Sequence, residues 1–168
     1  MTDIIIRRAV REDVPFLLDI YNYEVVNSAA TLDLNPRTLD EWYAWYEAHQ
    51  TDLHPLFVAE CAKAGTVLGY SSFSPFRSKE GYRSTVELSI YVSKDARGRG
   101  VATMLLEALV DHAWASDEIH LVISIITSEN VPSMHLHRKF GFTYRGTLHE
   151  VGHKMGRYVG ISIYELMV

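Results

Sequence analysis

The stretch from residue 86 to residue 109 constrains the fold most, because it joins a strand pattern to a helix pattern through two glycines. Residues 86–92 form an apolar, β-branched run that predicts a strand. From Val101 the apolar positions recur at intervals of three and four residues, as on one buried face of a helix. Between them, Gly98 and Gly100 let the backbone turn so that its N–H groups point to one spot. This order indicates an α/β domain with an anion-binding loop.

The rest of the chain adds further strand and helix patterns. We expect strands at residues 4–7, 56–60, 67–73, 86–92, 121–126 and 158–168, and helices at residues 14–25, 40–49, 101–109 and 133–140. The two strands at 56–60 and 67–73 read as a hairpin that turns at Ala64 and Gly65. The chain has 168 residues and shows no linker or repeat. It therefore predicts a single domain over residues 1–168, in the order β-α-α-β-β-β-α-β-α-β, with a mixed sheet.

Composition excludes several classes of function. Hydrophobic residues make up 48% and charged residues 22% of the chain, as in globular proteins. The net charge of -5 argues against a nucleic-acid-binding protein. Residues 1–8 do not read as a signal peptide, and no apolar run reaches membrane-spanning length, so we expect no membrane partner. The lone Cys61 is expected to be a buried thiol and suits a cytoplasmic location. The histidines lack the spacing of a metal site, so we expect no metal.

The glycine loop has the residues to hold a pyrophosphate. Arg97 and Arg99 can donate charge-assisted hydrogen bonds to phosphate oxygens, next to the positive end of the following helix. A basic surface turn that only caps the helix is the alternative interpretation. Thr103 stands where a dinucleotide-binding loop would have its last glycine, and no Walker lysine follows. Nicotinamide and nucleoside-triphosphate chemistry are therefore disfavoured.

The loop resembles the signature Arg/Gln-x-x-Gly-x-Gly/Ala of the GCN5-related N-acetyltransferase superfamily through Arg97, Gly100, Val101 and Ala102. The resemblance covers nearly the whole chain and narrows to the phosphinothricin/methionine sulfoximine N-acetyltransferase subgroup. The matching segments are Ile20-Tyr21-Asn22, Ser28-Ala29-Ala30-Thr31, Phe76-Arg77, residues 81–92, Asn130-Val131-Pro132-Ser133, Leu136-His137, Gly141-Phe142 and residues 151–157. One departure is Tyr158-Val159-Gly160, where the subgroup usually has a tryptophan followed by an aspartate.

This resemblance implies an α/β GCN5-related acetyltransferase fold, with a mixed, mostly antiparallel sheet and helices on both faces. It implies acetyl-CoA as the cofactor and a homodimer as the assembly. The implied cofactor-binding residues are Ile90, Tyr91, Val92, Arg97, Gly98, Arg99, Gly100, Val101, Ala102, Thr103, Asn130 and Ser133. A main-chain N–H in the run 90–92 would hold the thioester oxygen as charge develops on it. Asn130 can equally cap the following helix.

Glu87 and His137 are the candidate catalytic residues. An α-amine has a pKa of about 8, so a base must remove its proton, and we assign this role to Glu87. The alternative for Glu87 is an ordinary surface carboxylate on a strand. His137 stands where many relatives outside the subgroup have a tyrosine that protonates the thiolate, and the alternative is a packed structural histidine.

The candidate substrate-binding residues are Phe76, Arg77, Tyr82, Glu87, Leu88 and Ser89. Arg77 is expected to bind the carboxylate of an amino acid, although it can also be a plain surface arginine. Phe76 and Tyr82 would form an apolar wall, with Leu88 and Ser89 beside the amine. The chain is thus predicted to acetylate a small amino acid or analogue by direct attack in a ternary complex. Two alternatives remain: an acetyltransferase for a protein N-terminus or a polyamine, and a non-enzymatic acyl-CoA-binding module.

Overall fold

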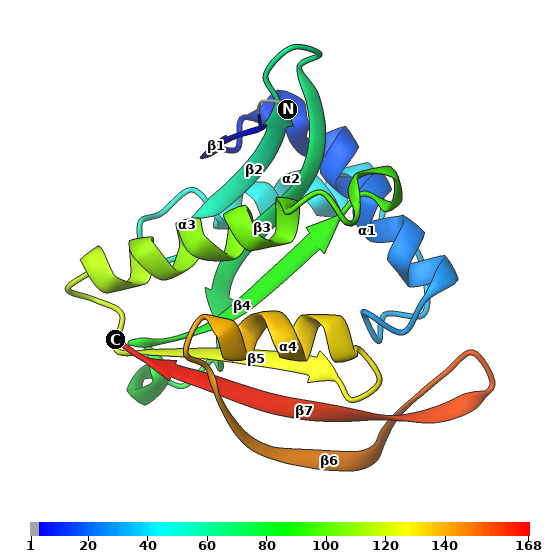
Figure 1. Ribbon diagram of the computed structural model, residues 1–168, viewed down its shortest axis with the longest axis vertical. Helices are drawn as coiled ribbons and strands as arrows, with labels where there is room; N and C mark the ends of the chain where they lie inside the picture. The colour runs from blue at the N-terminus through cyan, green and yellow to red at the C-terminus, as the bar shows by residue number, and fades with distance from the viewer. Residues whose placement is uncertain (1–3) are drawn as a thin grey trace.

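A mixed sheet with helices on both faces organises the computed structural model, which describes residues 4–168 (Figure 1). The strands are β1 (Ile4–Arg8), β2 (Leu56–Cys61), β3 (Thr66–Pro75), β4 (Thr85–Val92), β5 (Leu121–Thr127), β6 (Thr143–Lys154) and β7 (Arg157–Met167). The helices are α1 (Val14–Asn27), α2 (Leu39–Ala48), α3 (Val101–Ala115) and α4 (Val131–Lys139). Short 3-10 turns occupy Arg11–Asp13, Glu80–Tyr82 and Lys94–Ala96. The part of the signal-peptide argument that concerns residues 1–3 lies outside the described residues.

The sheet order is β1-β2-β3-β4-β5-β7-β6, and only β4 and β5 run parallel among its paired strands. This confirms the predicted mixed, mostly antiparallel α/β fold. The expected hairpin between β2 and β3 is also present, and its Gly65 has a φ of 65°, which a glycine adopts without strain.

Apolar side chains attach a pair of helices to each face of the sheet. Helices α1 and α2 pack on Val58 and Tyr70. Helix α3 packs on the other face, where Leu106 and Leu109 meet Val86 and Leu88 of β4. Helix α4 lies on this second face as well, in front of β5 in Figure 1. Successive residues of a strand point to opposite faces, so Glu87, Ser89 and Tyr91 of β4 face α1 and α2.

The parallel strands β4 and β5 stay together over only part of their length. Their pairing runs from Thr85 with Leu121 to Leu88 with Ser124, whereas β4 continues to Val92 and β5 to Thr127. Figure 1 shows β4 and β5 starting side by side and then diverging. The far edge of β4 remains paired with β3 as far as Val92. The sheet therefore opens between its two halves at the carboxyl ends of β4 and β5.

Strand β6 was missing from the sequence-based prediction, which had six strands. Most of its side chains are exposed, so it lacks the alternation of apolar and polar residues that marks a half-buried strand. Its pairing with β7 is interrupted at Tyr144/Gly146 and Leu148/Gly152, and Glu150 has a φ of 54°. A twisted strand at the edge of a sheet with these irregularities gives no clear period in the sequence.

The described residues form neither a membrane-spanning helix nor a metal-binding cluster. None of the helices within residues 4–168 combines the length and the apolar character needed to cross a bilayer. In the same part of the chain, no three His, Cys, Asp or Glu side chains gather as they do around a metal ion. Cys61 is a buried free thiol in β2, as predicted.

Gly69 determines how closely β3 approaches the end of β4. A Cβ atom at this position would lie 2.8 Å from the Tyr91 carbonyl oxygen and 3.1 Å from the Val92 Cα. We predict that Gly69→Ala lowers the free energy of unfolding by about 1–3 kcal/mol, because backbone atoms cannot move aside cheaply. Urea denaturation measures this change. Gly81→Ala is the matched control, since no atom lies within 4 Å of its added Cβ; equal losses in both variants would contradict the prediction.

Candidate active site

The opening between β4 and β5 contains the larger of two adjoining cavities, with a volume of about 700 Å³. Its walls come from α1, β4, the glycine loop, the first turn of α3, the end of β5 and the start of α4. All the predicted cofactor residues except Arg99 line it: Ile90, Tyr91, Val92, Arg97, Gly98, Gly100, Val101, Ala102, Thr103, Asn130 and Ser133. Residues that are far apart in the sequence thus share one cavity.

The start of α3 gives this cavity an anion-binding end. Gly98 and Gly100 have φ values of 72° and 80°, and no atom lies within 4 Å of a Cβ built on either. The first backbone hydrogen bond of the helix runs from the Met104 N–H to the Gly100 carbonyl. The three preceding N–H groups of the helix therefore have no intrahelical acceptor, and their residues line the cavity. A pyrophosphate fits this end of the cavity, because it accepts hydrogen bonds and is favoured by the helix dipole.

The two arginines of the loop differ in their surroundings. Arg97 lines the cavity and pairs with Glu24, a buried carboxylate of α1 that also accepts a hydrogen bond from Ser28. Arg99 lies away from this cavity, in a separate depression beside Cys61 and Asp95. The structure therefore brings Arg97, but not Arg99, to the predicted cofactor site.

Asn130 and His137 are both tied to the first turns of α4. Asn130 caps the helix, since its Oδ1 accepts from the Ser133 N–H at 3.3 Å. The His137 Nδ1 lies 2.8 Å from the Ser133 carbonyl oxygen, which only accepts, so Nδ1 carries the hydrogen. Its Nε2 then accepts from the Ser124 hydroxyl at 2.9 Å. Burial lowers the pKa of His137, so the imidazole is held neutral with both nitrogens bonded. The side chain does not line the cavity, and its catalytic role stays a prediction.

Glu87 lies on the face of the sheet that carries α1 and α2. Its neighbours Val86 and Leu88 belong to the core under α3, so its side chain points the other way. It is half-buried, and burial raises the pKa of its carboxyl group. Within residues 4–168 the carboxylate has no ion pair or hydrogen bond to another side chain. A partly desolvated, unneutralised carboxylate is a stronger base than an exposed one.

Arg77, which is predicted to bind the substrate carboxylate, lies near the amino-terminal end of β4. Arg77 is exposed, and its Cζ atom stands 5.2 Å from the ring centre of Phe76 and 5.8 Å from that of Tyr82. The two rings meet edge to face at 5.8 Å. These contacts hold the guanidinium on an aromatic support. Phe76, Arg77 and Tyr82 are thus together in the connection between β3 and β4, and none of them lines the larger cavity.

A second cavity of about 360 Å³ lies on the α1 and α2 side of the sheet. Ser89 and Tyr91 line it from β4, and Tyr91 lines the larger cavity as well. The two cavities therefore adjoin at the end of β4. The predicted substrate residue Ser89 belongs to this second cavity, whereas Leu88 is buried in the core below α3.

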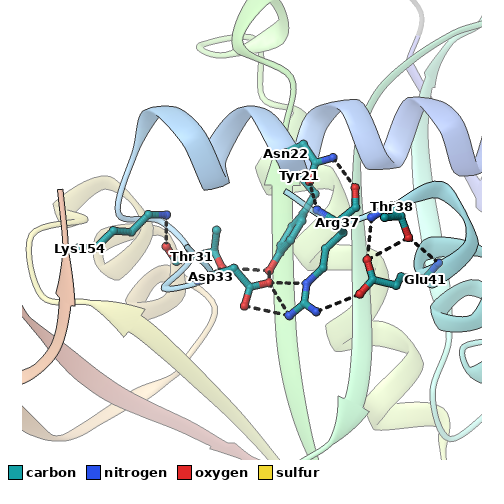
Figure 2. Close-up of polar contacts among 8 residues, drawn as sticks. All are labelled: Tyr21, Asn22, Thr31, Asp33, Arg37, Thr38, Glu41 and Lys154. Carbon is teal, nitrogen blue, oxygen red and sulfur yellow. Dashed lines mark hydrogen bonds and ion pairs between the residues drawn. The ribbon is translucent and has the colours of Figure 1, made fainter. Parts of the chain in front are cut away.

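The segment between α1 and α2, residues 28–38, borders both cavities and is held by several polar contacts (Figure 2). The Asn22 side chain exchanges two hydrogen bonds with the backbone of Arg37, at 2.8 and 2.9 Å. The Tyr21 hydroxyl, whose pKa burial raises to about 12, donates to Asp33 at 2.7 Å. Asp33 in turn accepts from Arg37 at 2.9 and 3.0 Å. From the end of β6, the buried Lys154 donates to the Thr31 carbonyl at 2.6 Å.

Sequence reasoning assigned no role to several of these residues. Glu24 occupies a position on the apolar face of α1, three residues after Tyr21. Because a charged residue on an apolar helix face is buried only when it is paired, this position was a signal for a buried ion pair. Trp42 was assigned to a helix from its spacing, but nothing in the pattern placed it over a cavity. Asp33 and Arg37 lie in a loop and carry no periodic signal. At the point of departure from the subgroup, Tyr158 is exposed, and the neighbouring Arg157 pairs with Glu129.

Comparisons with known proteins agree with this geometry. The acetyltransferase (GNAT) domain family matches residues 3–143. The chain is 40% identical over 161 residues to an L-methionine sulfoximine/L-methionine sulfone acetyltransferase of Pseudomonas paraeruginosa, across 96% of this chain and 92% of the relative. It is 38% identical over 161 residues to a phosphinothricin N-acetyltransferase of Streptomyces coelicolor, across 95% and 94%. A crystal structure of a GNAT superfamily phosphinothricin acetyltransferase from Sinorhizobium meliloti, in complex with acetyl-CoA, is similar with a TM-score of 0.92 and 31% identity, across 100% of this chain and 89% of the other.

Two buried histidines make the stability of the fold depend on pH. Burial lowers the pKa of both His49 and His137, so the folded chain keeps them neutral where the unfolded chain takes up protons. The free energy of unfolding is therefore predicted to fall as the pH drops below the unfolded value of about 6.5. Urea unfolding at about pH 7.5 and about pH 5.5 measures the difference. Equal stability at the two pH values would contradict the prediction.

Proposed function

This chain belongs to the GNAT acetyltransferase family, and we propose that it transfers the acetyl group to the α-amine of a small amino acid or analogue. It is an acyl-CoA-dependent N-acetyltransferase whose donor is acetyl-CoA. The proposal is carried by one observation: the two cavities share Tyr91 as a lining residue. Glu87, a carboxylate without an ion pair in the described residues, lies on the same strand and faces the side of the second cavity, where the acceptor would bind. The names of two relatives, which act on methionine sulfoximine or sulfone and on phosphinothricin, support an amino acid as acceptor.

The larger cavity fits the donor. The N–H groups at the start of α3 would hold the pyrophosphate, and Asn130 and Ser133 would contact the pantetheine arm. Past Leu88, β4 has no strand beside it on the cavity side, so a main-chain N–H near Ile90 is free to donate. When bound, acetyl-CoA supplies a thioester carbonyl, and this donor would stabilise the negative charge that develops on its oxygen.

Glu87 would act on the acceptor. The α-amine of an amino acid is largely protonated at neutral pH, and only the neutral amine attacks a carbonyl. Burial raises the pKa of Glu87 towards that of the amine, so proton removal, directly or through one water, is less uphill than for an exposed glutamate. No side-chain nucleophile is required, because the amine attacks in a ternary complex. Arg77 would bind the carboxylate, supported by Phe76 and Tyr82.

We place the enzyme in the cytoplasm and expect a homodimer. The buried free thiol of Cys61 is compatible with a reducing compartment. Strands β6 and β7 and the turn between them expose large apolar side chains that a second copy can cover: Leu148, Val151, Met155 and Tyr158.

Glu87→Gln tests the base. The variant is predicted to lower kcat by about 10²–10⁴-fold, because the amide cannot accept the proton, and to leave acetyl-CoA affinity unchanged. In the wild type, kcat should fall as the pH drops through the raised pKa of Glu87, and the variant should lack this decline. Steady-state thiol release and calorimetric titration of acetyl-CoA measure these effects. Glu107→Gln, on the exposed side of α3, is the control; a wild-type rate for Glu87→Gln would remove Glu87 as the base.

Arg77→Ala separates an amino-acid acceptor from other amines. If the guanidinium binds the carboxylate, the KM for amino acids should rise about 10–100-fold, as expected for a lost hydrogen bond to a charged group. The KM for acetyl-CoA should not change. The acceptor panel contains L-methionine sulfone, L-methionine sulfoximine, L-phosphinothricin, spermidine and a peptide with a free N-terminus. Arg83→Ala, an exposed arginine in the next segment, is the control. Activity on the peptide or on spermidine alone would favour the alternative acceptors.

A further inference from the structure

The wall of the larger cavity contains a buried carboxylate. Glu24 of α1 is 5% exposed and lines the cavity together with two other charged residues, Arg97 and Glu129. No further charged residue within residues 4–168 lines it. Glu129 is exposed and pairs with Arg157, which lies outside the lining. A cavity that fits a polyanion therefore has two carboxylates in its wall and one cation.

Glu24 binds the guanidinium of Arg97 from the side of α1. One carboxylate oxygen pairs with Arg97 Nη2, and the other accepts a hydrogen bond from the Ser28 hydroxyl. The Ser28 oxygen in turn accepts from the Ala30 N–H at 3.1 Å. Both oxygens of Glu24 are therefore held in place. The Arg97 side chain is 54% exposed, and within residues 4–168 its Nε and Nη1 make no hydrogen bond, so they can still donate to a ligand.

The stability of the fold does not account for this pair. Taking a carboxylate out of water is costly, and well-packed apolar side chains often stabilise a fold as much as a buried ion pair does. Position 24 lies on the apolar face of α1, four residues after Ile20 and seven after Leu17, where an apolar side chain would also be buried. The exposure of Arg97 screens the pair and weakens it further. The location of Glu24 in the cavity wall indicates a role in donor binding instead.

The pair sets the charge beside the pyrophosphate site. Arg97 lies three residues before Gly100, after which the first N–H groups of α3 are free to bind an anion. An unpaired guanidinium here would add charge-assisted hydrogen bonds to phosphate oxygens. Glu24 shares this guanidinium and also places a negative charge next to the anion, and both effects weaken the attraction.

Acetyl-CoA and the product CoA have the same pyrophosphate, so this weakening acts on both. Binding energy that is the same in the ground state and in the transition state does not accelerate the chemical step. A stronger hold on the pyrophosphate would therefore not speed acetyl transfer, but it would slow the departure of CoA. A carboxylate that reduces this hold favours release of the product.

We propose that Glu24 limits the affinity of the donor site for coenzyme A, because it neutralises Arg97 beside the pyrophosphate and so lets the product leave after acetyl transfer. Glu24 is a positioning residue, since it acts through Arg97. The inference deepens the proposed function and rests on the pyrophosphate binding at the start of α3. It does not depend on which amine accepts the acetyl group. Donor affinity should follow the net charge of the pair, which is zero in the wild type.

Calorimetric titration of CoA at one pH and one salt concentration tests this relation. Glu24→Gln leaves the pair positive and should lower the Kd about fivefold to tenfold, whereas Arg97→Gln leaves it negative and should raise the Kd by a similar factor. The double variant Glu24→Gln/Arg97→Gln is neutral again and should bind within about twofold of the wild type. Asp19→Asn is the matched control, because Asp19 is an exposed carboxylate of α1 outside the cavity lining; its Kd should not change.

Further measurements separate the charge of Glu24 from its place in the fold. Glu24→Met removes the carboxylate but keeps a side chain of similar length, and it should lower the Kd as Glu24→Gln does; urea unfolding checks that both variants are folded. The inhibition constant of CoA, measured by chromatography of the acetylated amine, should fall by the same factor as the Kd. With S-acetylpantetheine, a donor that lacks the pyrophosphate, Glu24→Gln should have the kcat/KM of the wild type.

Several results would overturn the inference. An unchanged Kd in Glu24→Gln and Glu24→Met would mean that the charge of the pair does not act on the pyrophosphate. A higher Kd would mean that Glu24 holds Arg97 in place for the phosphate. A double variant that binds as weakly as Arg97→Gln would show that Arg97 acts independently of Glu24. All three leave the acetyl-CoA-dependent reaction standing. If the wild type binds no CoA, the proposed function fails, and this inference fails with it.

Discussion

The divergence of β4 and β5 beyond Leu88 and Ser124 is the constraint on which the site depends. Each strand keeps a full partner on its outer side, β3 for β4 and β7 for β5, so the sheet opens without unpairing either half. Because the two strands are parallel, their carboxyl ends, and the loops that follow them, lie at the same edge of the sheet. The loop after β4 leads to the N-terminus of α3, whose first three N–H groups have no intrahelical acceptor. The loop after β5 leads to Asn130. A single opening thus places both ends of the donor site.

The segment at residues 28–38 connects the donor side to the acceptor side. Its first residues border the larger cavity, and Asp33 and Arg37 border the second one. The segment has little secondary structure of its own, and its position depends on Lys154 from β6 and on Asn22 from α1. Burying an amine is unfavourable, and burial lowers the pKa of Lys154, but its hydrogen bond to the Thr31 carbonyl offsets part of that cost. The edge strand β6, irregular and exposed, therefore contributes to the site indirectly, by holding the segment that borders both cavities.

Sequence patterns predicted the elements that have a strong period and missed those that do not. The start of α3 at Val101, the hairpin at Gly65 and the buried thiol of Cys61 followed from local spacing and turn chemistry. Strand β6 had no such period. Ten of the twelve predicted cofactor residues follow one another along β4 and the glycine loop, whereas Asn130 and Ser133, after β5, were predicted only from the family resemblance. The second cavity is lined by α1, α2, β3, β4 and the segment at residues 28–38, and only tertiary packing brings these parts of the chain together.

Electrostatics differ between the two sides of β4. On the donor side the buried Glu24 neutralises much of the charge of Arg97, so the pyrophosphate would depend chiefly on the N–H groups and dipole of α3. This explains how a chain with a net charge of -5 can bind a polyanion through one helix end. On the other side, two carboxylates, Asp33 and Glu41, line the second cavity with one cation, Arg37, and within residues 4–168 the Glu87 carboxylate has no ion pair. In the proposed reaction these carboxylates would attract the ammonium form of an amino acid, and Arg77, near the amino-terminal end of β4, would bind its carboxylate. An acceptor held in this way would lie along β4 before its amine loses a proton.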